Sequence, residues 1–214
     1  LLLAGLAGMV NETLDRIMVK YLIEGSANAM KQLGIYGACY KLSILMTLFI
    51  QAFRYAAEPF FFAQFKKEDA RKVYANVMKY FVIACAIIFL AIMMYIDIVK
   101  YFIGKNYWPG LKVVPILLLA NLCLGVFFNL SMWYKLTGKT MYGAWFAIFG
   151  AIITITFNFI LIPKLGYMGA AWTTLICYGS MMILSYVIGQ RNYKIAYELK
   201  RLLGYLFFAI ALFF

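Results

Sequence analysis

A series of long apolar runs is the feature that most constrains how this chain can fold. Each run lasts about 20 residues and is followed by a short polar stretch. A helix needs about 20 apolar residues to cross the hydrocarbon core of a bilayer, whereas the strands of a membrane barrel alternate over about 10 positions. The sequence therefore predicts an all-α, polytopic transmembrane helix bundle.

We expect six full spans and a truncated seventh. The full spans are placed at about residues 1–23, 34–63, 76–98, 111–134, 142–162 and 167–189. Residues 1–189 would form a six-helix transmembrane bundle. Residues 190–214 would form an amphipathic connector and the start of an additional transmembrane helix. Because the chain has no initiator Met and stops inside an apolar run, we expect it to be part of a longer protein.

The basic residues indicate an orientation in the membrane rather than a role with nucleic acid. The formal net charge is +12, yet Lys and Arg gather in the short loops between apolar runs. One set of alternate loops is clearly richer and contains Lys66, Lys67, Arg71, Lys72, Lys135, Lys139, Arg191, Lys194, Lys200 and Arg201. Cytoplasmic loops carry an excess of Lys and Arg, so we expect this set, and residue 1 with it, in the cytoplasm. Membrane lipids are expected partners and nucleic acid is not.

The composition does not favour an enzyme or a metal-binding protein. The chain contains no histidine, which excludes Ser-His and Cys-His nucleophiles and histidine-based metal sites. The four cysteines lie far apart in apolar surroundings, without the spacing of metal ligands or a redox pair. No Gly-rich loop followed by Lys and Ser or Thr suggests an ATP site. We therefore expect no cofactor, no metal and no enzymatic activity.

The second expected span carries a polar stripe. Thr47, Gln51, Arg54 and Glu58 are spaced four, three and four residues apart, which places them on one helical face. Two interpretations remain open. In the first, the stripe lines a cavity, and Pro59 kinks the helix or loosens its end. In the second, Arg54 and Glu58 form an i,i+4 ion pair near the helix end and reach into the headgroups.

The first expected span carries more charge. Glu12, Arg16 and Lys20 repeat every four residues, and Asp15 lies three positions after Glu12. A charged side chain deep in a bilayer costs roughly 3 kcal/mol on insertion scales and usually faces a bundle interior or a watery cavity. A carboxylate here would bind a coupling cation or take a proton, and Arg16 would meet an anionic headgroup. The alternative is an internal salt-bridge cluster that only holds helices together.

Later spans carry scattered polar side chains, for which interhelical hydrogen bonds are the default role. These are Asn121, Asn129, Thr154, Thr156, Asn158, Thr173 and Thr174. Trp108, Trp133 and Trp145 are expected in the aromatic belts at the membrane interfaces. Asp97 and Lys112 lie near the ends of expected spans, so we expect them at the membrane interfaces as well.

Three segments together give the chain a family likeness. The pair DR at residues 15–16 is followed after a loop by GIYGACYK at residues 34–41. The long second span ends in EPF at residues 58–60, and residues 158–174 read NFILIPKLGYMGAAWTT. In these features the chain resembles the C-terminal half of a bacterial polysaccharide flippase. That family belongs to the superfamily that also contains the multidrug and toxic compound exporters.

The resemblance implies a two-lobe exporter fold, with six helices per lobe, of which this chain is the second lobe. It implies alternating access by rocking of the lobes, driven by an ion gradient or the membrane potential. The implied substrate is an undecaprenyl-pyrophosphate-linked oligosaccharide repeat unit. It would cross the bacterial inner membrane for O-antigen, lipopolysaccharide or other polysaccharide biosynthesis. The alternative is a cation-coupled multidrug exporter, whose cavity would be acidic and weakly cationic.

The resemblance also suggests site residues. Relatives with a sodium site take ligands from the first helix of this lobe and from its fifth and sixth helices, which gives Asp15, Asn158 and Thr174. Glu12 is a further candidate for binding the coupling ion, because it lies in the same expected span as Asp15. Such relatives tend to carry a carboxylate where Asn158 stands, so both Na⁺ and H⁺ remain candidates for the coupling ion. Cations suit a pyrophosphate, and the expected cavity residues are Arg16, Arg54, Glu58, Gln51, Lys20 and Lys41.

Overall fold

The computed structural model describes residues 13–213, and all regular structure in that part of the chain is helical. Residues 13–22 form the first helical stretch. The following elements are α2 (Ser26–Gln64), α3 (Ala70–Met94), α4 (Ile96–Val99), η1 (Lys100–Phe102), η2 (Lys105–Val113), α5 (Val114–Leu130), α6 (Met132–Leu136), α7 (Met141–Leu165), α8 (Tyr167–Asn192) and α9 (Leu199–Phe213). The all-α class is thereby confirmed.

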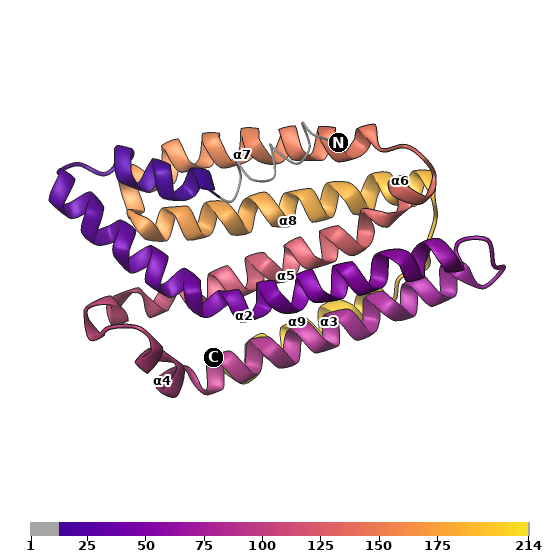
Figure 1. The fold of residues 1–214 in the computed structure, drawn as a ribbon, viewed down its shortest axis with the longest axis horizontal. Coiled ribbons are helices and arrows are strands. Elements are labelled where there is room, and N and C mark those ends of the chain that lie inside the picture. Colours follow the sequence, from indigo (N-terminus) through magenta and orange to yellow (C-terminus); the bar gives the residue numbers. More distant parts are fainter. Residues whose placement is uncertain (1–12, 214) are drawn as a thin grey trace.

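The long helices run roughly along the longest dimension of the molecule (Figure 1). α8 packs against α7 and α5, α2 packs against α5, and α3 packs against α9. α5 also touches α3, so it lies at the centre of the bundle. This position agrees with its composition, because a helix that is apolar all round is normally buried.

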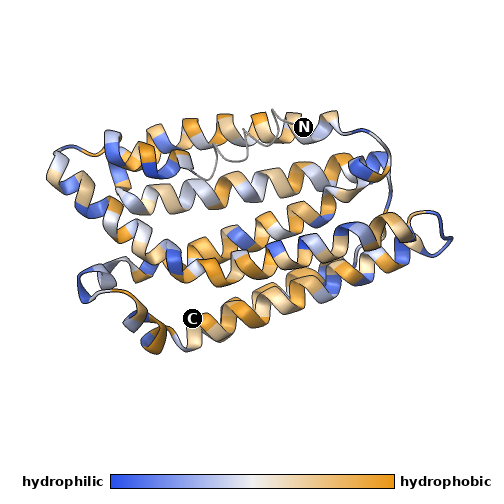
Figure 2. Cartoon of the chain, in the orientation of Figure 1, coloured by the Kyte–Doolittle hydropathy of each residue, from blue (hydrophilic) through white to orange (hydrophobic). Residues whose placement is uncertain are grey.

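Five helical segments are long and apolar enough to cross a membrane: Ser26–Gln64, Ala70–Met94, Lys105–Leu136, Met141–Leu165 and Tyr167–Asn192. They correspond to the second to sixth expected spans, and Figure 2 shows their mainly hydrophobic ribbons. The first expected span falls largely on residues 1–12, outside the described residues. α9 has 15 residues, fewer than the roughly 20 that a crossing needs. These five helices are compatible with a multi-pass membrane protein.

Residues 24–33, which connect the first two expected spans, are mostly helical, so the second helix begins earlier than the expected residue 34. α2 begins at Ser26, and the turn before it is made by Gly25 with a φ of 82°. The segment contains strong helix formers and no proline. In addition, Gln32 Oε1 accepts a hydrogen bond from the backbone N–H of Tyr167 at 3.0 Å. This contact ties the start of α2 to the start of α8.

α2 also continues through Pro59 and ends at Gln64, so the loosened end that one of the two interpretations placed at Pro59 is not observed. Two tertiary contacts hold its last turns. The hydroxyl of Tyr74 donates to the carbonyl of Phe61 at 2.8 Å, and Gln64 Nε2 donates to Asp69 Oδ1 at 3.0 Å. These bonds offset the backbone hydrogen bond that proline removes.

Small residues let the central helices approach closely. A Cβ added to Gly125 of α5 would lie 2.5 Å from Phe81 Cζ of α3 and 3.1 Å from Ile50 Cγ1 of α2. Close backbone approach of this kind is a common way for helices to associate in lipid. Gly125 therefore marks the point where α2, α3 and α5 meet.

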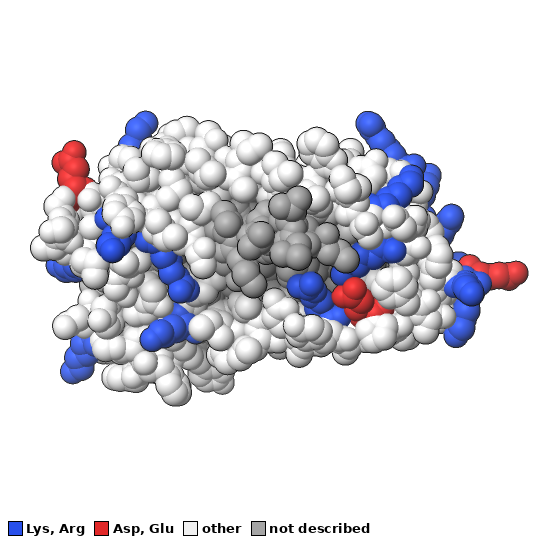
Figure 3. All heavy atoms as spheres, turned by 45° about the horizontal axis from the view of Figure 1, so that its top comes forward, with Lys and Arg blue, Asp and Glu red and all other residues white. Residues whose placement is uncertain are grey.

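The basic loops lie together at one end of the bundle. Lys139 Nζ donates to Asn192 Oδ1 at 2.7 Å, and the guanidinium of Arg71 lies 5.0 Å from the ring centre of Tyr193. Figure 3 shows that Lys and Arg gather mainly toward the two ends of the molecule. We call the end that carries the α2–α3, α6–α7 and α8–α9 connections the basic end. Its assignment to the cytoplasm stays a prediction.

The expected aromatic belt is only partly observed. Trp145 is 65% exposed, as a belt residue should be. Trp133 is only 3% exposed and lies 4.9 Å, ring to ring, from Tyr142. A Cβ on Gly189 would come within 2.9 Å of its Cδ1. Trp133 therefore packs between helices, in space that a glycine on α8 leaves open, rather than facing outward, and its place at the membrane interface stays a prediction.

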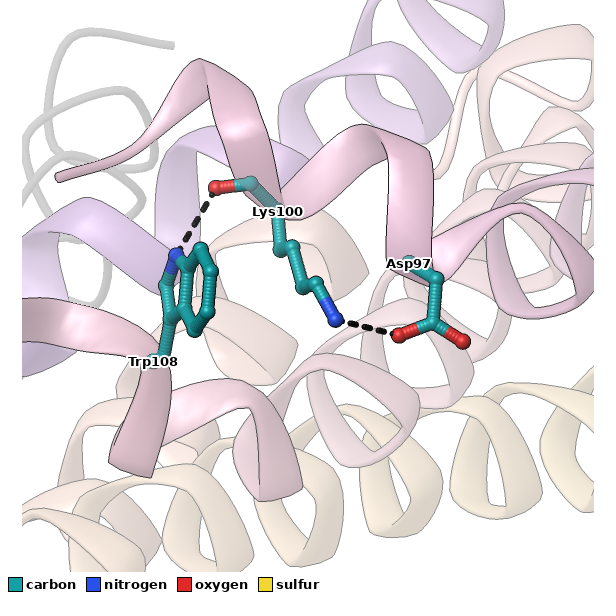
Figure 4. A network of polar contacts seen from close by, with 3 residues as sticks. All are labelled: Asp97, Lys100 and Trp108. Carbon is teal, nitrogen blue, oxygen red and sulfur yellow. Dashed lines mark hydrogen bonds and ion pairs between the residues drawn. The ribbon is translucent and has the colours of Figure 1, made fainter. Parts of the chain in front are cut away.

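The segment between α3 and α5 carries a polar cluster at the opposite end (Figure 4). Lys100 donates to Asp97, and Trp108 Nε1 donates to the carbonyl of Lys100 at 3.2 Å. The Lys100 ammonium also lies 4.9 Å from the centre of the Trp108 ring. The hydrogen bond to Asp97 raises the pKa of Lys100. A tryptophan and a lysine held together in this way are typical of a membrane interface.

Candidate functional site

A buried carboxylate forms the centre of the first candidate site, which we call the Asp15 site. Asp15 lies on the helix of residues 13–22 and is 4% exposed. Its Oδ1 accepts a hydrogen bond from Asn158 Nδ2 at 2.8 Å, and its Oδ2 accepts one from Thr174 Oγ1 at 2.6 Å. The hydroxyl of Tyr36 lies 3.5 Å from Oδ2. The site therefore draws on four separate helices.

The sequence positions these partners through close packing of α7 and α8. A Cβ on Gly169 would lie 2.4 Å from the carbonyl oxygen of Leu161, so the two helices touch through backbone. Gly166, with a φ of 60°, makes the tight turn that joins them. The turn and this contact bring the inward faces of α7 and α8, with Asn158 and Thr174, beside one another.

The hydrogen bonds around Asp15 leave one acceptor without a partner. Asn158 Oδ1 is buried and has no hydrogen-bond partner among the described residues. Thr174 Oγ1 also lies 2.9 Å from the carbonyl of Ala170, and a hydroxyl has only one proton to donate. A turn of the Asn158 amide about its last torsion would bring its oxygen beside the carboxylate of Asp15 and the hydroxyl oxygen of Thr174. Such hard oxygen ligands suit a small cation or a proton.

No cation of the described chain neutralises Asp15 through an ion pair. Its neighbour Arg16 is exposed and lies over the ring of Tyr40, 4.7 Å from the centre. Burying an unpaired ionised carboxylate is costly. A bound proton or a monovalent cation would remove that cost. The described residues contain no group of three or more acidic, cysteine or histidine side chains, so a multi-carboxylate metal centre is not formed there.

The two lysines expected to line the cavity with Arg16 are also exposed. Lys20 lies 5.3 Å from the ring centre of Tyr21, and Lys41 projects from α2. Charged side chains at membrane depth normally face water or another protein surface. Arg16, Lys20 and Lys41 are therefore suited to line a polar cavity. Glu12, the other expected coupling residue, lies outside the described residues.

A second polar site lies between α2, α5 and α6, and we call it the Arg54 pocket. It is lined by Ile50, Phe53, Arg54, Ala57, Glu58, Phe61, Gly125, Phe128, Asn129, Met132 and Lys135. The guanidinium of Arg54 lies 4.6 Å from the ring centre of Phe128. Glu58 Oε1 accepts a hydrogen bond from Lys135 Nζ at 2.9 Å. The ion pair that we considered between Arg54 and Glu58 is not formed, because Glu58 binds Lys135 instead.

The rest of the stripe on α2 is half-buried. Gln51 and Thr47 lie between the two sites, and Thr47 Oγ1 is buried without a hydrogen-bond partner in the described part of the chain. Tyr36 and Arg54 are 18 positions apart on α2, which at 1.5 Å per residue is about 27 Å. The expected cavity residues therefore divide between two places joined by one helix. The structure records no contact between Arg16 and Arg54.

Sequence reasoning missed three residues of these sites. Tyr36 is part of the GIYGA segment, but nothing in the pattern indicated that its hydroxyl faces Asp15. Lys135 was counted only among the loop cations. Asn129 was assigned an interhelical hydrogen bond, yet its Nδ2 is buried without a partner among the described residues. The default role does hold for Asn158 and Thr174.

The chain was compared with protein families, curated proteins and solved structures. No protein-family model matches the chain, and neither the curated proteins nor the solved structures contain a match.

Proposed function

We propose that this chain is the second lobe of an ion-coupled flippase for lipid-linked oligosaccharides. The substrate would be an undecaprenyl-pyrophosphate-linked repeat unit that moves from the inner to the outer leaflet of the bacterial inner membrane. Translocation would proceed by alternating access between this lobe and a first lobe elsewhere in the full-length protein.

The observation that carries the proposal is the buried, unpaired carboxylate of Asp15. An ionisable residue inside a membrane bundle is a functional-site hypothesis by default. A group that only held helices together would be expected to have a cationic partner, and the described residues supply none to Asp15. Its three hydrogen-bond partners lie on α2, α7 and α8. Binding or release of a cation or a proton would therefore change contacts among four helices.

The distribution of cations supports an anionic substrate. Arg16, Lys20 and Lys41 are exposed near the Asp15 site, and Arg54 and Lys135 line the pocket closer to the basic end. Guanidinium and ammonium groups are suited to the oxygens of a diphosphate. An exporter of cationic drugs would be expected to present mainly carboxylates. The charge of these surfaces favours the flippase over that alternative.

The direct test is complementation with the full-length protein. A host that lacks its resident polysaccharide flippase receives the wild-type gene, Arg16→Ala or Arg54→Ala, and surface polysaccharide is scored. We expect rescue by the wild type and loss of rescue by both variants at equal membrane abundance. Normal export by both variants would contradict the cationic cavity. Dye efflux by the wild type without any rescue would favour the multidrug exporter.

A further inference from the structure

The Arg54 pocket contains more hydrogen-bond donors than its own residues satisfy. Asn129 is 8% exposed, and its Nδ2 has no hydrogen-bond partner in the described part of the chain. The Arg54 guanidinium is stacked on Phe128 and forms no ion pair with a described carboxylate. Stacking on the ring face leaves the N–H edge of a guanidinium available. Both donors line the same pocket, whose free volume of about 10 Å³ holds one water molecule, so a larger acceptor enters only when Glu58 and Lys135 move apart.

The third donor, Lys135, is held by Glu58. The distance from Nζ to Oε1 is 2.9 Å, and the two side chains are 24% and 36% exposed. The ion pair is therefore open to exchange with a ligand rather than sealed in the core. A carboxylate and a phosphoryl group both present acceptor oxygens to an ammonium group. Glu58 thus occupies the place at Lys135 that a phosphoryl oxygen would take.

The charges of the pocket define the kind of ligand. Arg54 and Lys135 contribute two positive charges, and Glu58 removes one. The remaining single positive charge, with the amide of Asn129, suits one phosphoryl group. Displacement of Glu58 would expose the second positive charge to that group.

The depth of the pocket suits a phosphoryl group at the membrane surface. Glu58 lies six positions before Gln64, the end of α2, which is about 9 Å along the helix. The headgroup layer on each side of a bilayer is about 7 Å thick. Where the last turns of α2 lie among the headgroups of the basic end, as the predicted orientation places them, a phosphoryl group on a lipid in that leaflet would reach the pocket without leaving its own depth.

We infer that the Arg54 pocket is a phosphoryl-binding site in which Glu58 is an internal competitor for Lys135. The inference rests on the proposed function, and it assigns the loading of the diphosphate to this pocket. An arriving phosphoryl group takes Lys135 from Glu58 and accepts hydrogen bonds from Arg54 and Asn129. Loss of the Glu58–Lys135 contact removes the ion pair between α2 and α6 and leaves the packing of Met132 with Ala57 and Phe61, so binding weakens the contact between these helices.

The test measures binding to the purified full-length protein. Inorganic pyrophosphate is titrated in detergent, and a long-chain prenyl diphosphate is titrated in nanodiscs of neutral lipid. Glu58→Gln removes the competing charge and keeps the side-chain shape, so we expect binding about tenfold tighter for at least one probe. Lys135→Met should weaken binding about tenfold, and the double variant should behave like Lys135→Met. Glu198→Gln, which breaks the exposed ion pair with Arg201, is the matched control and should change nothing.

The two probes distinguish the source of the phosphoryl group. Tighter binding of both by Glu58→Gln supports a site for the phosphoryl group alone. Tighter binding of the prenyl diphosphate only supports a site for a lipid headgroup. Unchanged or weaker binding of both probes by a folded Glu58→Gln protein would overturn the inference, because the ion pair would then be only structural.

A second variant keeps the test decisive where Glu58→Gln does not fold. Asn129→Asp replaces the unpaired donor by an acceptor of the same shape, and we expect about tenfold weaker binding. Equal binding by Asn129→Asp and the wild type would contradict the site. Binding is measured without transport, so tighter binding in a protein that fails to flip lipid would support this inference while contradicting the proposed function.

Discussion

At the scale of single residues, Asp15 combines 4% exposure with hydrogen bonds from three neutral donors, of which that of Tyr36 is the longest. Its oxygens lie 2.8 Å from Asn158 Nδ2 and 2.6 Å from Thr174 Oγ1, and no described cation pairs with it. Replacing a buried charge by a neutral group of the same shape is often neutral or stabilising, whereas removing one partner leaves the others unpaired. The charge of Asp15 is therefore not expected to be needed for folding.

This argument predicts opposite effects for two substitutions at the same position. Asp15→Asn keeps the shape and should leave stability within about 1 kcal/mol of the wild type. Asp15→Ala leaves the buried Nδ2 donor of Asn158 without its acceptor, whereas Thr174 can still donate to the carbonyl of Ala170, and should cost about 1–3 kcal/mol. Thermal unfolding of the purified protein in one detergent compares the two. A strong loss of stability in Asp15→Asn would show that the carboxylate is structural.

The sequence indicated some of these residues and could not indicate others. Asp15, Asn158 and Thr174 were grouped through a resemblance, because contacts across 143 and 159 positions leave no periodic pattern. For Glu58 the local partner at i,i+4 was Arg54, but the partner in the structure is Lys135, 77 positions away. Spacing along a helix predicts neighbours on that helix only.

At the scale of helices, the apolar runs predicted five span-length segments correctly, and the errors lie at their ends. The start of α2 was expected later along the chain because its first residues are polar, although they favour helix. Inside the bundle, the sequence did not show which glycines are needed for packing. Gly125 meets Phe81 and Ile50, whereas an added Cβ on Gly179 would find nothing within 4 Å.

A matched pair of glycine substitutions tests this packing. Gly125→Ala places a methyl group 2.5 Å from Phe81 Cζ and should destabilise the protein by about 1–3 kcal/mol. Gly179→Ala fills open space in α8 and should be neutral or stabilising by up to about 1 kcal/mol. Thermal unfolding of the two variants gives the comparison. Equal stabilities would contradict the close approach of α2, α3 and α5.

At the scale of the whole molecule, the α2–α3, α6–α7 and α8–α9 connections lie at one end of the bundle and the segment from α4 to η2 lies at the other (Figure 1). Lys and Arg occur at both ends (Figure 3), and the sequence places more of them in the first set of connections. The excess of Lys and Arg predicts that the basic end faces the cytoplasm. Along α2 the Arg54 pocket lies toward this end, and the Asp15 site lies about 27 Å farther along the helix. Substrate and coupling ion would thus act at separate sites, to which α2 contributes Arg54 and Tyr36.

Cysteine labelling tests the predicted orientation. Lys67→Cys and Lys139→Cys should react with a membrane-impermeant maleimide only after the membrane is opened, and Phe102→Cys should react in intact cells. Cys39, Cys85 and Cys177 are buried and should give little background, and the half-buried Cys123 is replaced by alanine in each variant. Labelling of Lys67→Cys in intact cells would reverse the orientation and place the Arg54 pocket near the outer leaflet.

The central claim is that translocation of a lipid-linked oligosaccharide is coupled to a cation or proton at Asp15. The most direct measurement reconstitutes the full-length protein in proteoliposomes with a fluorescent lipid-linked oligosaccharide. Translocation is followed under an imposed Na⁺ or pH gradient, with Glu198→Gln as a charge-matched control. We predict that the wild type and the control respond to one of the two gradients and that Asp15→Asn loses the response. A gradient response in Asp15→Asn equal to that of the wild type would contradict the account.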